Sequence, residues 1–457
     1  MSALGAGAGY GGSRRGDKML QMSLMETLRG AWADPELRQR VLFVIKMFAV
    51  FVLGSHIAVP IPGVTPDELV SKLQNLPFFQ LIDTFGGGSI KRVSIFALGL
   101  NPYITASIII QILTTAFPHW KKELKEGGEY ARKQQNKRTK ALCLLLCVFQ
   151  GYGLLSMMKN GIGPDRIPIA VMVSTIIFWT AGSMFVLWLG EQISERGIGN
   201  GVSLMIFAGI ITSLPGMVSQ LWHSVLDRTT PWPGALALVA IFLGATWFIV
   251  YFTTAQRRIP VQHMKRMVGT KAVGGGGPNY LPFSVNMVGV IPIIFAVSLV
   301  SMPAQFAVMF PVTNPIHNVL SGIAEYLNPG ASFPKGLVGC FLYTAMIFFF
   351  TYFYTAVQYN VEDIADNLKR GGSFVPGVRP GKQTKDFLDG VISRITIVGA
   401  LFLAAIALMP YLAPAITQVQ TRVFSIIGGT SLLIMVQVAL ETMRQIEANL
   451  LMKQYGQ

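Results

Sequence analysis

The sequence predicts an all-α membrane protein that crosses the bilayer ten times and keeps both ends in the cytoplasm. Of its 457 residues, 52% are hydrophobic and only 13% are charged, whereas a soluble globular domain carries about 25% charged residues. The Lys and Arg residues behind the net charge of +15 lie in blocks between long apolar runs. The composition therefore argues against a water-soluble fold, and the placement of the basic residues is more informative than their sum.

Ten apolar stretches approach the length of about 20 residues that an α-helix needs to cross a bilayer. They cover residues 41–59, 95–117, 141–158, 168–189, 202–220, 234–253, 286–310, 337–358, 391–413 and 423–440. Residues 1–40 are expected to form a cytoplasmic tail with an amphipathic segment, and residues 441–457 a second cytoplasmic tail. The N-terminal tail begins with a Gly-rich segment that lacks a continuous apolar core, so no cleaved signal peptide is expected.

The basic residues orient the spans, because Lys and Arg are retained in cytoplasmic loops. With the N-terminus inside, alternate loops hold most of the 37 Lys and Arg residues. The opposite side then holds only Lys72, Lys91, Arg92, Lys159, Arg166, Arg228, Lys335 and Arg422. The reverse orientation would contradict nearly every loop.

Several connecting segments are too long to be simple turns. The cytoplasmic segments at about 254–285 and 359–390 are rich in Lys and Arg, and loops longer than about 15 residues are usually functional or disordered. Attraction to anionic lipid explains their charge, but a docking surface for a cytoplasmic partner explains their length as well. On the outer side, the apolar stretch Phe78–Phe85 is too short to span and fits a half-helix that folds back into the membrane.

The sequence lacks the residues that catalysis or ion coupling inside a membrane requires. Ionisable residues are nearly absent from the predicted spans, although charges there are the usual mark of a functional site. HExxH and GxSxG motifs are absent, and the segment Gly377–Gln383 does not match a phosphate-binding loop. Cys143 and Cys147 share a helix face but have no His or carboxylate partner for a metal. We therefore expect no enzyme activity, cofactor or metal, and any energy must come from a partner.

Five long motifs occur along the predicted spans and loops. They are SIFALGLNPYITASIIIQILT (Ser94–Thr114), WLGEQISERGIGNGVSLMIFAGII (Trp188–Ile211), VNMVGVIPIIFA (Val285–Ala296), DNLKRGGSFVPGVRPG (Asp366–Gly381) and IIGGTSLLIMVQV (Ile426–Val438). Together they resemble the SecY family, the central subunit of the bacterial protein-translocation channel. The motifs occur in the family's order, and the resemblance extends from about residue 20 to residue 450. It implies two pseudo-symmetric halves of five helices, here residues 41–220 and 221–440, related as an inverted repeat and hinged between the fifth and sixth helices.

The resemblance assigns a pore constriction to six aliphatic residues, a plug to residues 77–90, and a lateral gate to the second and seventh spans. The pore residues are Leu100, Ile104, Val202, Ile206, Ile294 and Ile434. The plug residues are Phe78, Phe79, Leu81, Ile82, Phe85, Gly86, Gly87 and Gly88. Gln111 and Asn286 are the polar gate residues, and a polar contact between them and generic helix packing remain equally open.

The same resemblance assigns the two long cytoplasmic loops to partner docking. The candidate docking residues are Arg257, Arg258, Lys265, Arg266, Arg379 and Lys382. The implied partners are the SecA ATPase motor, the ribosome, the small subunits SecE and SecG, signal sequences and nascent chains, and anionic phospholipids. Guanidinium groups suit both ribosomal RNA phosphates and an acidic protein surface.

The function implied is a passive channel in the bacterial plasma membrane that passes unfolded secretory proteins across and membrane segments sideways into lipid. Two other classes compete with this hypothesis. A secondary transporter also commonly has an inverted repeat, but the spans lack the charges it would use. A membrane enzyme would need a catalytic constellation that the sequence lacks.

Overall fold

Ten long helices occupy the positions of the ten predicted spans. The computed structural model describes residues 24–61, 83, 86–162, 168–227, 231–263, 266–268, 271–273, 279–307, 310, 314–331, 334–417 and 428–455. Within this part the long helices are α3 (Pro35–Ser55), α6 (Asn101–Ala116), α8 (Gly128–Ile162), α9 (Ile169–Arg196), α10 (Gly201–Leu226), α11 (Trp232–Thr254), α12 (Ile291–Ala307), α14 (Lys335–Gln358), α16 (Lys382–Thr417) and α18 (Gly429–Tyr455).

In α6 and α12, a glycine with left-handed backbone delays the start of the helix relative to the predicted apolar stretch. The second stretch begins at residue 95, but α6 begins at Asn101 because Gly99 takes a left-handed conformation with φ +53°. The seventh stretch begins at residue 286, but α12 begins at Ile291, after Gly289 with φ +73°. Left-handed backbone interrupts a right-handed helix, so in both cases the first residues of the motif form an irregular segment.

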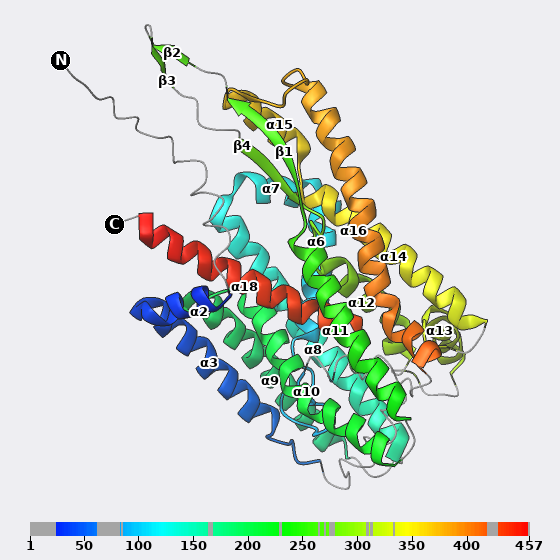
Figure 1. The fold of residues 1–457 in the computed structure, drawn as a ribbon. Coiled ribbons are helices and arrows are strands. Elements are labelled where there is room, and N and C mark those ends of the chain that lie inside the picture. Colours follow the sequence, from blue (N-terminus) through cyan, green and yellow to red (C-terminus); the bar gives the residue numbers. More distant parts are fainter. Residues whose placement is uncertain are drawn as a thin grey trace, which may run out of the picture.

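Shorter elements lie between the long helices. They are the helices α2 (Leu24–Ala33), α7 (Pro118–Glu126), α13 (Pro315–Leu327) and α15 (Val361–Arg370), and the strands β1 (Gln256–His263), β2 (Arg266–Val268), β3 (Lys271–Val273), β4 (Asn279–Ser284) and β5 (Ser373–Phe374). The strands lie at one end of the helical bundle (Figure 1).

The bundle has the surface of a membrane protein. Six of its helices, α8 to α11, α14 and α16, are long and apolar enough to cross a bilayer. α12 is apolar but has 17 residues, and α6 has 16. Large apolar side chains such as Trp247 and Phe341 face outward from the described part of the bundle, as expected where lipid replaces water.

The long helices pack mainly within two sets of five, one from each half of the chain. Among the first five long helices, α8 packs against α6 and α9, and α9 also packs against α3 and α10. Among the last five, α14 packs against α12 and α16, and α18 packs against α11 and α16. The two sets meet where α10 packs on α18 and α11, and where α8 touches α12.

Both ends of the described chain lie on the same side of the molecule, which we call the terminal side. There α2 packs against α18, and Lys453 of α18 lies 2.8 Å from Asp34 and 2.7 Å from Glu36. Arg444 of α18 donates a 3.4 Å hydrogen bond to the Thr253 carbonyl at the end of α11, so the strands that follow α11 are on the terminal side as well. This placement agrees with the predicted common side for both tails.

Candidate pore constriction, plug and docking surface

The six aliphatic residues of the predicted constriction, which we call the candidate ring, meet in a single hydrophobic cluster. Leu100 precedes α6 and Ile104 lies on its first turn, Val202 and Ile206 lie one turn apart on α10, Ile294 is on α12, and Ile434 is on α18. Leu100, Ile206 and Ile434 are buried in this cluster, and the other three are half-buried and pack against it. The fold thus brings together four segments spread over more than 300 residues of sequence.

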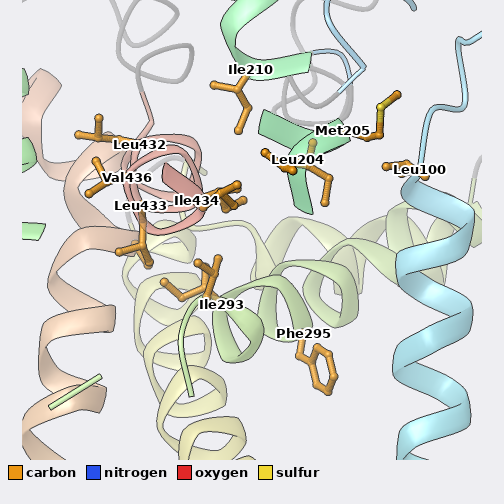
Figure 2. Close-up of a cluster of buried hydrophobic side chains, with 14 of the residues drawn as sticks. Leu100, Leu204, Met205, Ile210, Ile293, Phe295, Leu432, Leu433, Ile434 and Val436 are labelled. Atoms are coloured by element: carbon orange, nitrogen blue, oxygen red, sulfur yellow. The ribbon is translucent and has the colours of Figure 1, made fainter. Parts of the chain in front are cut away.

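Close neighbours fill the cluster around the ring. Figure 2 shows Ile434 pointing from α18 toward Leu204 of α10, while Leu100 points from the start of α6 toward the same space. Ile293 of α12 lies on another side of the same cluster (Figure 2). The side chains of the ring carry no polar atom, so they offer neither ions nor peptide groups a binding partner.

The irregular segment before α6 holds Leu100 in place. The Ser183 hydroxyl of α9 donates a 2.7 Å hydrogen bond to the Gly99 carbonyl. Gly182 allows the Ile95 carbonyl to approach the α9 backbone so closely that a Cβ on residue 182 would collide with it. The glycine and serine on α9 therefore position the entry to α6, and with it the first residue of the candidate ring.

The end of the predicted plug lies directly beside the candidate ring. A Cβ on Gly87 would come within 3.5 Å of the Gly209 backbone, and Gly209 lies one turn after Ile206 on α10. A Cβ on Gly99 would lie 3.7 Å from Gly86, which places the same segment against the start of α6. The remaining plug residues Phe78, Phe79, Leu81, Ile82 and Phe85 lie outside the described residues.

A buried carboxylate organises the segment that follows the plug glycines. Asp83 Oδ1 accepts hydrogen bonds from the Ile90 N–H at 3.0 Å and the Lys91 N–H at 3.2 Å. Its other oxygen lies 3.3 Å from Lys91 Nζ, and the Asp83 side chain is buried. The Gly88 N–H donates to the Asp83 carbonyl at 2.8 Å. These bonds tie Asp83 to Gly88, Ile90 and Lys91, and we call Asp83 together with residues 86–91 the Asp83 loop.

The two predicted gate residues have separate partners in the described part of the chain. Gln111 on α6 donates a 3.2 Å hydrogen bond to Ser107 on its own helix. Asn286 lies before α12, where its Oδ1 accepts from the Gly289 N–H at 3.1 Å. Its buried Nδ2 has no hydrogen-bond partner among the described residues. One contact between the two sides is an aromatic pair, in which the rings of Phe149 on α8 and Phe306 on α12 are centred 5.4 Å apart.

The two predicted docking loops join into one structure. β1 pairs antiparallel with β4 along the first loop and with β5 of the second loop, where Gln262 lies opposite Phe374. Beneath this sheet, Ile259 and Phe283 pack with Val375 and with Leu388 of α16 in a separate hydrophobic cluster. The sheet therefore stands on its own core, at a fixed position on the terminal side.

Basic side chains project from the β4–β1–β5 sheet and from the loop before α16, which together we call the platform. Arg257 and Arg258 on β1, Arg379 in the loop before α16 and Lys382 at its start are all exposed. Within the described part of the chain none of these four forms an ion pair. Arg266 lies on β2, where its side chain is not described, and Lys265 lies outside the described residues. Unpaired cations on a rigid support are suited to bind an anionic partner.

Comparisons with known proteins agree with this geometry. The sequence model of the SecY family matches residues 94–443. The chain belongs to the SecY family. The protein translocase subunit SecY of Aquifex aeolicus is 41% identical over 440 residues, which cover 94% of this chain and 99% of that one.

Solved structures share the fold. One was described as showing that the plug domain of the SecY protein stabilises the closed state of the translocation channel and maintains a membrane seal. It matches with a TM-score of 0.63 at 18% identity, over 89% of this chain and 91% of that one. Sec61 in the canine ribosome-channel complex matches with a TM-score of 0.58 at 17% identity, over 89% and 91%.

Several residues of this SecY-family chain escaped sequence reasoning. Asp83 is one, because a single acidic residue in an external loop carries no visible signal. Ile198 is another, since it is buried with Leu37 and Ile446 in a cluster that joins α3 and α18. The sequence signal for Ile198 was its position between two glycines, because glycines permit close packing.

Proposed function

We propose that this chain is the central subunit of a gated protein-conducting channel that translocates unfolded secretory proteins across the bacterial plasma membrane and releases membrane segments sideways into lipid. The observation that carries the proposal is the candidate ring, in which four distant segments bring six aliphatic side chains into a single hydrophobic cluster. An apolar constriction passes a polypeptide without binding it and excludes ions, because ions cannot shed their water there. A transporter site would instead present polar or charged groups to a specific substrate.

The plug and gate act on either side of this ring. The Gly86–Gly88 segment beside Gly209 supports a plug that rests against the ring from the side opposite the chain ends. Opening toward lipid requires α12 to separate from α6 and α8, and the Phe149–Phe306 pair is the described contact that this motion breaks. Translocation therefore needs two changes, displacement of the plug and parting of the gate helices.

The energy comes from partners that dock on the terminal side. The chain itself is not a catalyst in this proposal. Its exposed Arg257, Arg258 and Arg379 fit the anionic surface of a motor ATPase such as SecA or the phosphates of a ribosome. We further propose that SecE and SecG complete the complex, and that both chain ends face the cytoplasm.

The test is import of an unfolded secretory precursor into proteoliposomes that contain this chain, its small partner subunits and the motor, with ATP. Arg379→Glu places a negative charge on the platform and is expected to reduce import at least about tenfold, since a like charge facing an acidic surface repels it. Arg132→Glu makes the same charge change at an exposed residue of α8 and is the matched control.

Each outcome has a distinct meaning. Import by wild type and by Arg132→Glu, with loss for Arg379→Glu, supports both the channel and the platform. If a correctly assembled wild-type complex imports nothing with either motor or ribosome, the channel proposal fails. If Arg379→Glu imports as wild type does, the channel stands and the docking role of Arg379 is lost.

A further inference from the structure

A short helix between α12 and α14 presents an apolar face that the protein does not cover. On α13, Ile316, Val319, Ile323 and Tyr326 are 49%, 61%, 46% and 50% exposed. Their spacing of three, four and three residues puts them on one face of the helix. No residue of α13 is buried, so this helix is not part of the hydrophobic core.

The dimensions of α13 exclude a membrane span. Its 13 residues extend about 20 Å at 1.5 Å per residue, short of the hydrocarbon thickness of about 30 Å. It lies at the end of the bundle opposite the strands (Figure 1). An apolar stripe on a short helix at the end of a membrane bundle is typical of a helix that lies in the interface plane.

Both ends of α13 are fixed to neighbouring helices, the start to α12 and the end to α14. At its start, the Ile316 N–H donates to the Asn314 side chain at 3.0 Å, and His317 Nδ1 lies 2.8 Å from the Ala307 carbonyl, the last residue of α12. At its end, Lys335 of α14 lies 2.8 Å from Glu325 and 5.3 Å from the centre of the Tyr326 ring. The orientation of the exposed stripe is therefore set by the protein and needs no partner to create it.

The surface next to the stripe identifies the partner as lipid. α13 packs against α12 and α14, and α14 exposes Leu337 and Phe341 on the apolar surface that faces the bilayer. A Tyr ring with a Lys amine beside it is a common arrangement at the headgroup level of a membrane. α13 itself contains no Lys or Arg, so attraction to anionic headgroups has no source on this helix.

We propose that α13 lies in the bilayer interface on the side opposite the chain ends, inserts its Ile316–Tyr326 stripe at the boundary of headgroups and acyl chains, and anchors the end of α12 there. The interaction is apolar, so it takes phosphatidylcholine and anionic phospholipid alike. Lipid contacts then restrain one end of α12, the predicted gate helix. The end of α12 on the terminal side is left unrestrained.

The test measures the depth of two labelled positions in reconstituted complexes. Val319→Cys on the stripe and Asn318→Cys, which is exposed and lies about 100° around the helix from residue 319, each receive an environment-sensitive nitrobenzoxadiazole probe. The wild-type chain treated in the same way is the blank, since Cys143 and Cys147 are buried and Cys340 is half-buried. Quenching is measured with spin-labelled phosphatidylcholine from within the bilayer and with iodide from the water.

We expect the lipid quencher to act on residue 319 at least about threefold more strongly than on residue 318, and iodide to show the reverse order, because one face is inserted and the other is wet. Vesicles of pure phosphatidylcholine and vesicles with added phosphatidylglycerol should give the same result. Equal iodide quenching at both positions would overturn the proposal. So would protection of residue 319 from both quenchers, which indicates a protein partner, or lipid quenching only when anionic lipid is present.

Discussion

At the scale of single residues, the surroundings of Asp83 bear most directly on how the channel is kept closed. Its buried carboxylate accepts two backbone N–H bonds and pairs with Lys91, and hydrogen bonds to a charged group contribute about 1.5–3 kcal/mol each. The loop that it closes contains Gly86 to Gly88, which rest against α6 and α10 beside the candidate ring. Loss of the carboxylate charge should therefore loosen the plug at its point of attachment.

We predict that Asp83→Asn makes the resting complex leak ions. The amide replaces one acceptor oxygen by a donor and removes the pair with Lys91, so the Asp83 loop should open more often. The measurement is ion conductance of the complex in planar bilayers without a precursor. Lys91→Arg keeps the charge and is the control, which should stay sealed. A tight seal in Asp83→Asn would show that the loop does not hold the plug.

At the scale of elements, a set of charges fastens α18 to the beginning of α3. Lys453 contacts both Asp34 and Glu36. Its hydrogen bonds hold the pKa values of Asp34 and Glu36 below their ordinary values, and the same bonds raise the pKa of Lys453. All three groups are in contact with water, so the stabilisation is small and sensitive to salt.

This fastening predicts a defined pH dependence. Carboxyls whose pKa is lowered in the folded state stabilise it above their unfolded pKa, about 4, and lose that contribution as the pH falls through the folded values. Lys453→Met should therefore lower the thermal unfolding temperature of the detergent-solubilised complex at pH 7, with a difference from wild type that shrinks as the pH drops below about 4. Arg132→Met, which removes a charge from α8, is the control. A difference that is constant down to pH 3 would contradict this assignment.

At the scale of the whole molecule, we expect the contact between α8 and α12 to affect how easily the bundle parts toward lipid. The Phe149–Phe306 pair belongs to a class of aromatic contacts that contribute about 0.5–1.5 kcal/mol beyond their buried area. We predict that Phe306→Ala shifts the gate toward opening by about two- to twelvefold, given 1.4 kcal/mol per factor of ten.

The measurement is import of a precursor with a weakened signal sequence, which should rise in Phe306→Ala relative to wild type. Phe341→Ala removes an aromatic ring that faces lipid on α14 and should leave import unchanged. Equal gains in both variants would mean that the effect comes from altered lipid contacts and has no connection with the gate.

Prediction from sequence succeeded where the signal was local and failed where it depended on contacts. The ten long helices appear at the ten predicted stretches, because length and apolarity decide which segments a bilayer accepts. The strands β1, β4 and β5 were not predicted. β1 and β4 contain Pro260 and Pro282, and proline is uncommon in strands. The pairing of these strands depends on the cluster beneath them.

The sequence by itself determined the membrane class, the positions of the spans and the common side of the two chain ends, since hydropathy and charge act residue by residue. Motif resemblance added the six members of the candidate ring. Only the tertiary structure decided that these six pack together, that a buried Asp83 accepts hydrogen bonds from the backbone of Ile90 and Lys91, and that two distant loops form one sheet. The physical reason is that one Leu or Ile has the same hydropathy as any other, while burial and hydrogen bonding depend on which residues the fold makes neighbours.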